Sequence, residues 1–221
     1  RLTYTLVKHG YLEHTEDANG QPGYKLGSAV LALGGAMIAR MDMRALARPL
    51  MQDVAEKSGA LVGLGLRDRL SMIYVETCRS EAALTLSLNV GSRIPLATTA
   101  MGRACVAAMP PEQQKDVLEL MQLYYPKEWK TLWDELEEAM EQYQKTGYCI
   151  AAGTFARLTN TVAVPFVWGE GDNMMAFNSQ GPAHLQTPAR LARTGKRLIE
   201  MTEKIREQLA RGIPGPMYVS G

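Results

Sequence analysis

The chain has 221 residues, of which 46% are hydrophobic and 21% are charged, and its formal net charge is +1. This composition indicates a soluble chain with a real core, and the charge argues neither for nor against nucleic acid binding. The longest apolar run, residues 29–39, is too short to span a bilayer, and no signal peptide opens the chain. Three widely spaced cysteines, Cys78, Cys105 and Cys149, favour a reducing, cytoplasmic compartment over a disulfide framework.

The front of the chain predicts the last part of a winged helix-turn-helix. Residues 1–9 have the pattern of a helix end that stops at Gly10, and residues 11–14 and 23–27 predict two strands around a polar turn. In such a unit the helix lies in the major groove of DNA and the hairpin lies against the backbone. The candidate DNA-contacting residues are Arg1, Thr3, Tyr4, Lys8 and Lys25. Because the local charge is balanced, these residues permit DNA binding without requiring it.

Two helices are expected next. Residues 28–38 are apolar around most of the helix circumference, which indicates a helix that is buried or that pairs with a partner chain. Pairing suits a DNA-binding protein, because a two-fold dimer matches a palindromic site. Arg40, Arg44 and Arg48 share one helical face and could contact phosphates or an acidic partner, although a solvated face is the favoured interpretation. Pro49 is expected to kink or restart the helix.

From residue 59 onward, strands and helices alternate, which predicts an α+β domain with about six mostly antiparallel strands flanked by helices. The predicted strands are residues 60–66, 70–77, 83–89, 148–152, 161–168 and 173–180. The predicted helices are a short one after residue 99, then residues 111–123, 128–145 and a last helix capped by Thr187.

Residues 91–109 form the stretch around which the rest of this domain is organised. Thr98 and Thr99 open a helix of small residues, and the first amides of a helix have no partner within it. Such a start, fed by a Gly/Pro loop, can hold a carboxylate or a phosphate. The residues expected around such an anion are Thr98, Thr99, Ala100, Met101 and Gly102. On this stretch alone, an ordinary strand-to-helix crossover is the favoured alternative.

No convincing catalytic, cofactor or metal site is found in the sequence. It contains no Walker A loop, no G-x-S-x-G, no H-E-x-x-H and no Cys/His spacing for structural zinc. The segment Gly63-Leu64-Gly65 lacks the third glycine of a dinucleotide fingerprint. Cys105 lies in the small-residue helix, where an inert thiol is the default. Two rival functions stay open: an enzyme with Cys105 or Cys149 as nucleophile, and a ligand-free oligomerisation domain.

Asn178 and Gln180 lie two residues apart on a predicted strand, so their side chains share a face. Met174 and Ala176 share that face and suggest that it is covered, and covered amides must find partners, of which a bound ligand is one. Thr161 occupies the preceding strand. The alternative that the two amides end the strand in solvent has equal weight.

These segments together resemble the IclR-type bacterial transcription regulators over essentially the whole chain. The matching segments are TLVKHGYLE, GYKLG, LARPLMQDVAEKSG, GSRIPLATTAMGRACVAA, GYCIAAGTFARLTNTVAVP and NSQGPA, and their order and spacing make the match specific. The resemblance implies a winged helix-turn-helix in residues 1–27, linker and dimerisation helices in residues 28–58 and a GAF-like effector-binding domain in residues 59–221. It also implies that most of the DNA-reading helix lies outside this chain.

Regulators of this type bind promoter DNA as dimers or dimers of dimers and respond to small metabolites, often carboxylates. The ligand-contacting positions of the family map onto Ala100, Met101, Ala151 or Ala152, Thr161, Asn178 and Gln180. Members that sense small keto acids tend to carry an acidic residue after the turn at residues 147–148, where this chain has alanines. We therefore expect a carboxylate larger than a two- or three-carbon acid, for example an aromatic acid, and no enzymatic activity.

Overall fold

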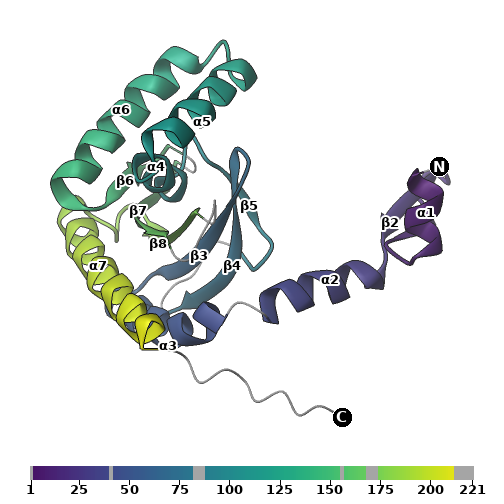
Figure 1. Cartoon of the computed structure of the whole chain (residues 1–221), viewed down its shortest axis with the longest axis horizontal. Coiled ribbons are helices and arrows are strands. Elements are labelled where there is room, and N and C mark those ends of the chain that lie inside the picture. Colours follow the sequence, from purple (N-terminus) through teal and green to yellow (C-terminus); the bar gives the residue numbers. More distant parts are fainter. Residues whose placement is uncertain (1, 40–41, 82–87, 155–156, 168–173, 212–221) are drawn as a thin grey trace. The chain divides into compact units, whose positions relative to one another are not determined.

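The structure, a computed structural model, describes residues 2–39, 42–81, 88–154, 157–167 and 174–211 (Figure 1). The chain divides into two compact units, Arg1–Asp42 and Met43–Gly221. The boundary falls inside the segment predicted as linker helices. In the described ranges, no helix is both long and apolar enough to cross a membrane.

The first unit is a helix followed by a hairpin and a second helix, in the predicted order. Helix α1 (Leu2–Lys8) ends at Gly10, whose φ of +73° lies in the left-handed region that favours glycine. Strands β1 (Leu12–Glu16) and β2 (Pro22–Leu26) pair antiparallel across a turn. Helix α2 (Ser28–Ala39) follows and exposes Leu31, Leu33 and Met37.

The second unit is built on one six-stranded antiparallel sheet in the order β5-β4-β3-β8-β7-β6. Its strands are β3 (Leu61–Asp68), β4 (Ser71–Arg79), β5 (Arg93–Pro95), β6 (Cys149–Ala152), β7 (Thr159–Val167) and β8 (Met174–Pro182). Its helices are α3 (Asp42–Ser58), α4 (Ala100–Ala107), α5 (Pro111–Tyr124), α6 (Trp129–Thr146) and α7 (Pro188–Ala210). The α+β class predicted from the sequence is confirmed.

Helices cover both faces of this sheet, with α4, α5 and α6 on one side and α3 and α7 on the other (Figure 1). Ala176 of β8 packs in the core cluster that contains Met101 of α4. Its neighbour Phe177 points to the opposite face, where its ring packs edge-on against Phe166, and Arg206 of α7 lies over the Phe166 ring. Successive residues of β8 therefore alternate between the α4 face and the α7 face.

Three sequence predictions need correction or stay open. The described sheet includes β5, which lies in the Gly/Pro loop predicted before the small-residue helix and was not among the predicted strands, because a three-residue strand that ends in proline leaves no periodic pattern. Most of the predicted strand at residues 83–89 lies outside the described residues. Helix α3 is continuous through Pro49, so the predicted restart is wrong; Ala47 and Met51 on either side are fully buried, and their packing holds the helix.

Candidate functional site

A small cavity lies between the start of α4 and the α4 face of the sheet. Its volume is about 10 Å³, which is room for about one water molecule. The lining residues are Ile94, Thr99, Ala100, Met101, Ala151, Thr154, Thr159, Thr161, Asn178 and Gln180. Five elements therefore converge on it: the first turn of α4 and the strands β5, β6, β7 and β8.

The start of α4 has two amides without hydrogen-bond partners in the described part of the chain, at residues that line this cavity. Thr99 caps the helix, because its Oγ1 accepts a hydrogen bond from the Gly102 amide at 3.1 Å. The amides of Ala100 and Met101 form no hydrogen bond with any described residue. Both residues line the cavity, so two N–H donors at the positive end of the helix dipole are available to an anion there.

Gly102 allows the backbone of Leu96 to pack directly against α4. A Cβ at this position would lie 2.0 Å from the Leu96 carbonyl oxygen and 2.5 Å from the Leu96 carbonyl carbon. Because those atoms are backbone, a side chain cannot be accommodated by a rotamer change. Gly102 shapes the helix start but does not line the cavity itself.

The two amide side chains of β8 are buried in the cavity wall. Asn178 is 1% exposed and Gln180 is 5% exposed, so the interpretation that they end the strand in solvent is wrong. Asn178 Nδ2 donates a hydrogen bond to the Tyr74 hydroxyl at 2.9 Å. Asn178 Oδ1 and Gln180 Nε2 have no hydrogen-bond partner among the described residues. A buried polar atom without a partner costs about 1–3 kcal/mol, so a molecule that satisfied these atoms would be stabilised.

Tyr74 lies beneath the cavity and is a site residue that sequence reasoning missed. It is fully buried, and burial raises the pKa of its phenol above the ordinary range. A Cβ on Gly63 would lie 2.2 Å from Tyr74 Cε1, so glycine at that strand position makes room for the ring. The alternating glycines at positions 63 and 65 are the sequence signal for close packing on this strand, since a Cβ on Gly63 would meet Tyr74 and a Cβ on Gly65 would meet Met101.

Of the other predicted effector positions, Ala151 and Thr161 line the cavity, whereas Thr98 and Ala152 lie outside its wall. Thr98 is half-buried, and its carbonyl accepts a hydrogen bond from Thr154 Oγ1 at 2.8 Å. Of the two alanines after the turn, Ala151 lines the cavity, whereas Ala152 is exposed and borders a neighbouring cleft of about 300 Å³. That cleft lies between α6 and the edge strand β6.

The candidate DNA-contacting residues are accessible on the first unit. Thr3, Tyr4 and Lys8 are exposed on α1, a helix with no buried residue. Lys25 lies on β2 and forms an ion pair of 3.1 Å with Glu13 on the facing strand. Arg1 lies outside the described residues. Their role in DNA contact stays a prediction.

The two cysteines proposed as nucleophiles are poor candidates. Cys105 and Cys149 are both completely buried. Burial raises the pKa of each thiol from 9.0 to about 12. The thiolate is the reactive form, so neither group is poised to attack a substrate near neutral pH.

These raised pKa values predict a loss of stability at alkaline pH. Above pH 9 the thiols ionise in the unfolded chain while the folded ones stay protonated until about pH 12. The unfolded state then binds fewer protons, so the free energy of unfolding falls by about 1.4 kcal/mol per pH unit for each thiol. Urea unfolding at a series of pH values checks this, and Cys105→Ala is expected to give a shallower slope than the parent chain. Equal slopes would contradict the prediction.

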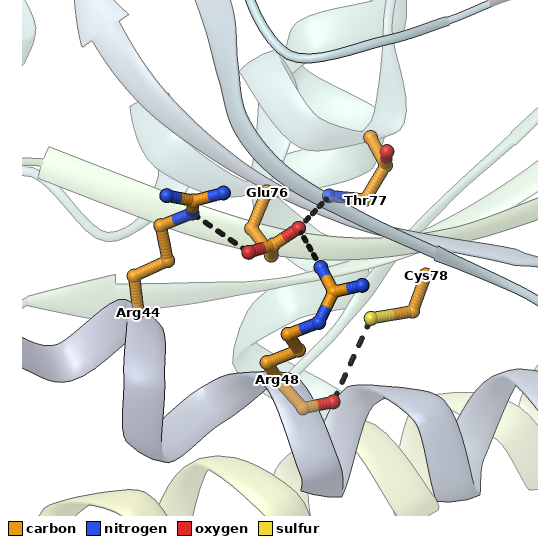
Figure 2. A network of polar contacts seen from close by, with 5 residues as sticks. All are labelled: Arg44, Arg48, Glu76, Thr77 and Cys78. Carbon is orange, nitrogen blue, oxygen red and sulfur yellow. Dashed lines mark hydrogen bonds and ion pairs between the residues drawn. The ribbon is translucent and has the colours of Figure 1, made fainter. Parts of the chain in front are cut away.

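Figure 2 shows a second polar cluster, on the opposite face of the sheet, where α3 packs against β4. Arg44 Nε lies 2.7 Å from Glu76 Oε2, and Arg48 Nη1 lies 2.7 Å from Glu76 Oε1. Arg44 and Arg48 therefore pair with a buried carboxylate of the same chain, while their side chains stay 31% and 61% exposed, so the expected solvated face describes them only in part. Arg40 lies outside the described residues.

A family model, curated relatives and solved structures that match this chain agree with one another. The family model described as "Bacterial transcriptional regulator IclR C-terminal" matches residues 35–207. The curated HTH-type transcriptional regulator TsaQ1/TsaQ2 of Comamonas testosteroni is 30% identical, over 99% of this chain and 79% of its own. The crystal structure of an IclR family transcriptional regulator from Brucella abortus is 37% identical with a TM-score of 0.85, covering 94% of this chain and 77% of that one. An IclR homolog from Microbacterium hydrocarbonoxydans, solved with 4-hydroxybenzoate, shares the fold at 24% identity, with a TM-score of 0.69 over 96% of this chain and 85% of its own.

Proposed function

Because the chain belongs to the IclR family of bacterial transcriptional regulators, we propose that it is a non-enzymatic regulator that binds a small carboxylate between α4 and β8. The observation that carries the proposal is the set of unused polar groups in one cavity. Two backbone amides, at Ala100 and Met101, and two side-chain atoms, Asn178 Oδ1 and Gln180 Nε2, lack partners among the described residues.

In this proposal the carboxylate accepts hydrogen bonds from the Ala100 and Met101 amides and from Gln180 Nε2. Hydrogen bonds to an ionised acceptor are about twice as strong as neutral ones, so this end of the ligand sets its orientation. Asn178 Oδ1 is an acceptor, and it calls for a donor on the ligand such as a hydroxyl group. Thr161, half-buried on β7, can both donate and accept. The expected effector is thus a hydroxylated carboxylate.

Any ligand larger than a water molecule requires the cavity to open, since its volume is about 10 Å³. Met101 is a flexible side chain whose sulfur lies over Gly65, and it can repack at small cost. The neighbouring cleft of about 300 Å³ shares Ala151 and Thr154 with the cavity, so displacement of these residues would join the two spaces. This arrangement supports an acid of more than three carbons, and the ligand of the Microbacterium homolog makes 4-hydroxybenzoate a rational first probe.

We further propose that residues 1–27 contribute to DNA binding and that residues 28–58 link and dimerise the protein. The exposed leucines and methionine of α2 support pairing of that helix with a second chain. The effector would then alter DNA affinity by favouring one arrangement of residues 59–221 over another.

A thermal-shift panel tests the proposed ligand class. At a concentration of 100 times its dissociation constant, a ligand of the folded state adds about 2.7 kcal/mol, which raises Tm by about 5–10 °C for a unit of this size. We expect that rise with 4-hydroxybenzoate or another hydroxylated acid in a panel that also contains benzoate, adipate, pyruvate and glyoxylate.

A matched pair of variants localises the effect. Gln180→Glu replaces the unused donor with a carboxylate and is expected to abolish the rise, whereas Gln122→Glu makes the same change on the exposed face of α5 and should retain it. No stabilisation by any acid would contradict the proposed function. A rise with pyruvate or glyoxylate alone would contradict only the predicted size.

A further inference from the structure

We infer that Tyr74 and Glu76 are positioning residues that connect the ligand cavity to α3 through a β-bulge, so that occupancy of the cavity changes how firmly α3 is held. The inference rests on the proposed function for the identity of the cavity as a ligand site. The contacts behind the inference do not depend on whether the cavity binds a ligand. They show how one strand presents two polar side chains to opposite faces of the sheet.

The bulge lies in β4 opposite β3. Gly65 pairs with Tyr74 and Leu64 pairs with Glu76, so Val75 is an extra residue with no partner on β3. Without this extra residue, side chains two positions apart would point to the same face. The bulge shifts the alternation by one, and bulges are a recognised device for re-aiming side chains next to functional sites.

Contacts show that the two side chains do point to opposite faces. Tyr74 belongs to the core cluster on the α4 side, where its hydroxyl accepts the hydrogen bond from Asn178. Glu76 is 2% exposed and meets Arg44 and Arg48 of α3 on the other side (Figure 2). One short segment of backbone therefore joins Tyr74, the partner of the cavity-lining Asn178, to Glu76, the anchor of α3.

The Glu76 anchor holds the N-terminal half of α3. Its Oε1 also accepts a hydrogen bond from the Thr77 amide at 3.0 Å, and Cys78 Sγ donates a long hydrogen bond of 3.6 Å to the Arg48 carbonyl. The C-terminal end of α3 has a separate anchor, because the Ser58 carbonyl accepts hydrogen bonds from Gln186 Nε2 and Arg190 Nη2. A change at Glu76 would thus loosen the N-terminal half of α3 selectively.

The consequence is a contiguous route from the cavity to α3. A ligand that donates to Asn178 Oδ1 would move the amide group whose Nδ2 donates to the Tyr74 hydroxyl, and movement of Tyr74 would be transmitted through the buried Val75 to Glu76. The N-terminal half of α3 leads along the chain, through residues 40–41, toward the first unit. Networks of packed and hydrogen-bonded residues of this kind modulate coupling between sites by factors of about 2 to 30.

Native-state hydrogen exchange of the full chain, without any ligand, tests the route. Tyr74→Phe keeps the ring and removes the hydroxyl, and we expect it to speed exchange of the amides within residues 43–50, apart from Pro49, which has none, roughly 2- to 30-fold while leaving α7 unchanged. Thr161→Val is the matched control: it removes a hydroxyl that lines the same cavity from β7, and it should leave residues 43–50 unchanged.

A double-mutant cycle identifies Glu76 as the link. In a Glu76→Gln background, Tyr74→Phe should have no further effect on residues 43–50. Should Glu76→Gln fail to fold, Arg48→Met provides a second background, because that side chain is 61% exposed. The inference would be overturned if Tyr74→Phe sped exchange of residues 43–50 as much in the Glu76→Gln background as in the parent chain. It would also be overturned if Thr161→Val sped that exchange as much as Tyr74→Phe does. Failure of every acid in the thermal-shift panel would overturn the proposed function but leave this result standing.

Discussion

Replacement of both arginines around Glu76, as Arg44→Met with Arg48→Met, is expected to lower the free energy of unfolding by about 3–5 kcal/mol. The double variant leaves the Glu76 carboxylate 2% exposed, with the Thr77 amide as its one remaining partner among the described contacts. A buried charge without compensation is costly, whereas an apolar replacement of the whole cluster can be neutral. Urea unfolding followed by circular dichroism measures the loss.

The reverse change, Glu76→Met, should lower the free energy of unfolding by less than the double variant does, and this difference serves as the control. In Glu76→Met the two guanidinium groups stay partly hydrated, because the Arg44 and Arg48 side chains are 31% and 61% exposed. The triple variant, with all three residues replaced by methionine, should regain most of the stability that the double variant loses. If Glu76→Met lowered the free energy of unfolding as much as the double variant does, the instability of the double variant would not come mainly from the buried, unpaired carboxylate.

Gly102→Ala is expected to destabilise the second unit by an amount near the upper end of about 1–3 kcal/mol and to abolish stabilisation by carboxylates. The added Cβ would meet the Leu96 carbonyl oxygen at 2.0 Å, so α4 must move away from the preceding loop. That movement would displace the Ala100 and Met101 amides, which the proposed function assigns to the carboxylate. Unfolding by urea and the thermal-shift panel together measure both effects.

Gly34→Ala is the matched control for this substitution. It makes the same chemical change within α2, where a Cβ would have nothing within 4 Å. The substitution should leave unfolding of the second unit unchanged and slightly favour α2, since alanine is the better helix former by about 1 kcal/mol. If Gly102→Ala behaved in the same way as Gly34→Ala, the close approach at Leu96 would not be what shapes the site.

Local patterns in the sequence were enough to locate the helix start and the strand amides of the site. The capping threonines predicted the beginning of α4, and the period of two along β8 correctly placed Asn178 and Gln180 on one face. These features depend on nearest neighbours along the chain. A helix cap and the alternation of side chains along a strand both follow from the spacing of residues in the sequence, which a single sequence shows directly.

The missed features depend on contacts between distant segments. Arg48 and Glu76 are 28 residues apart, and Tyr74 and Asn178 are 104 apart, so nothing in the local pattern links them. The bulge at Val75 is a one-residue shift in pairing that alternation alone cannot reveal, because buried residues occur on both faces of β4. The cavity size likewise depends on side-chain packing from five separate elements.

A backbone-amide NMR titration of the chain with 4-hydroxybenzoate, and with the other acids of the panel, tests the proposed carboxylate site most directly. We expect saturable shifts that are largest for the Ala100 and Met101 amides and for the side-chain amides of Asn178 and Gln180. Saturable shifts centred instead on the cleft around Arg103 and Glu135, or no saturable shift with any acid, would contradict a carboxylate site between α4 and β8.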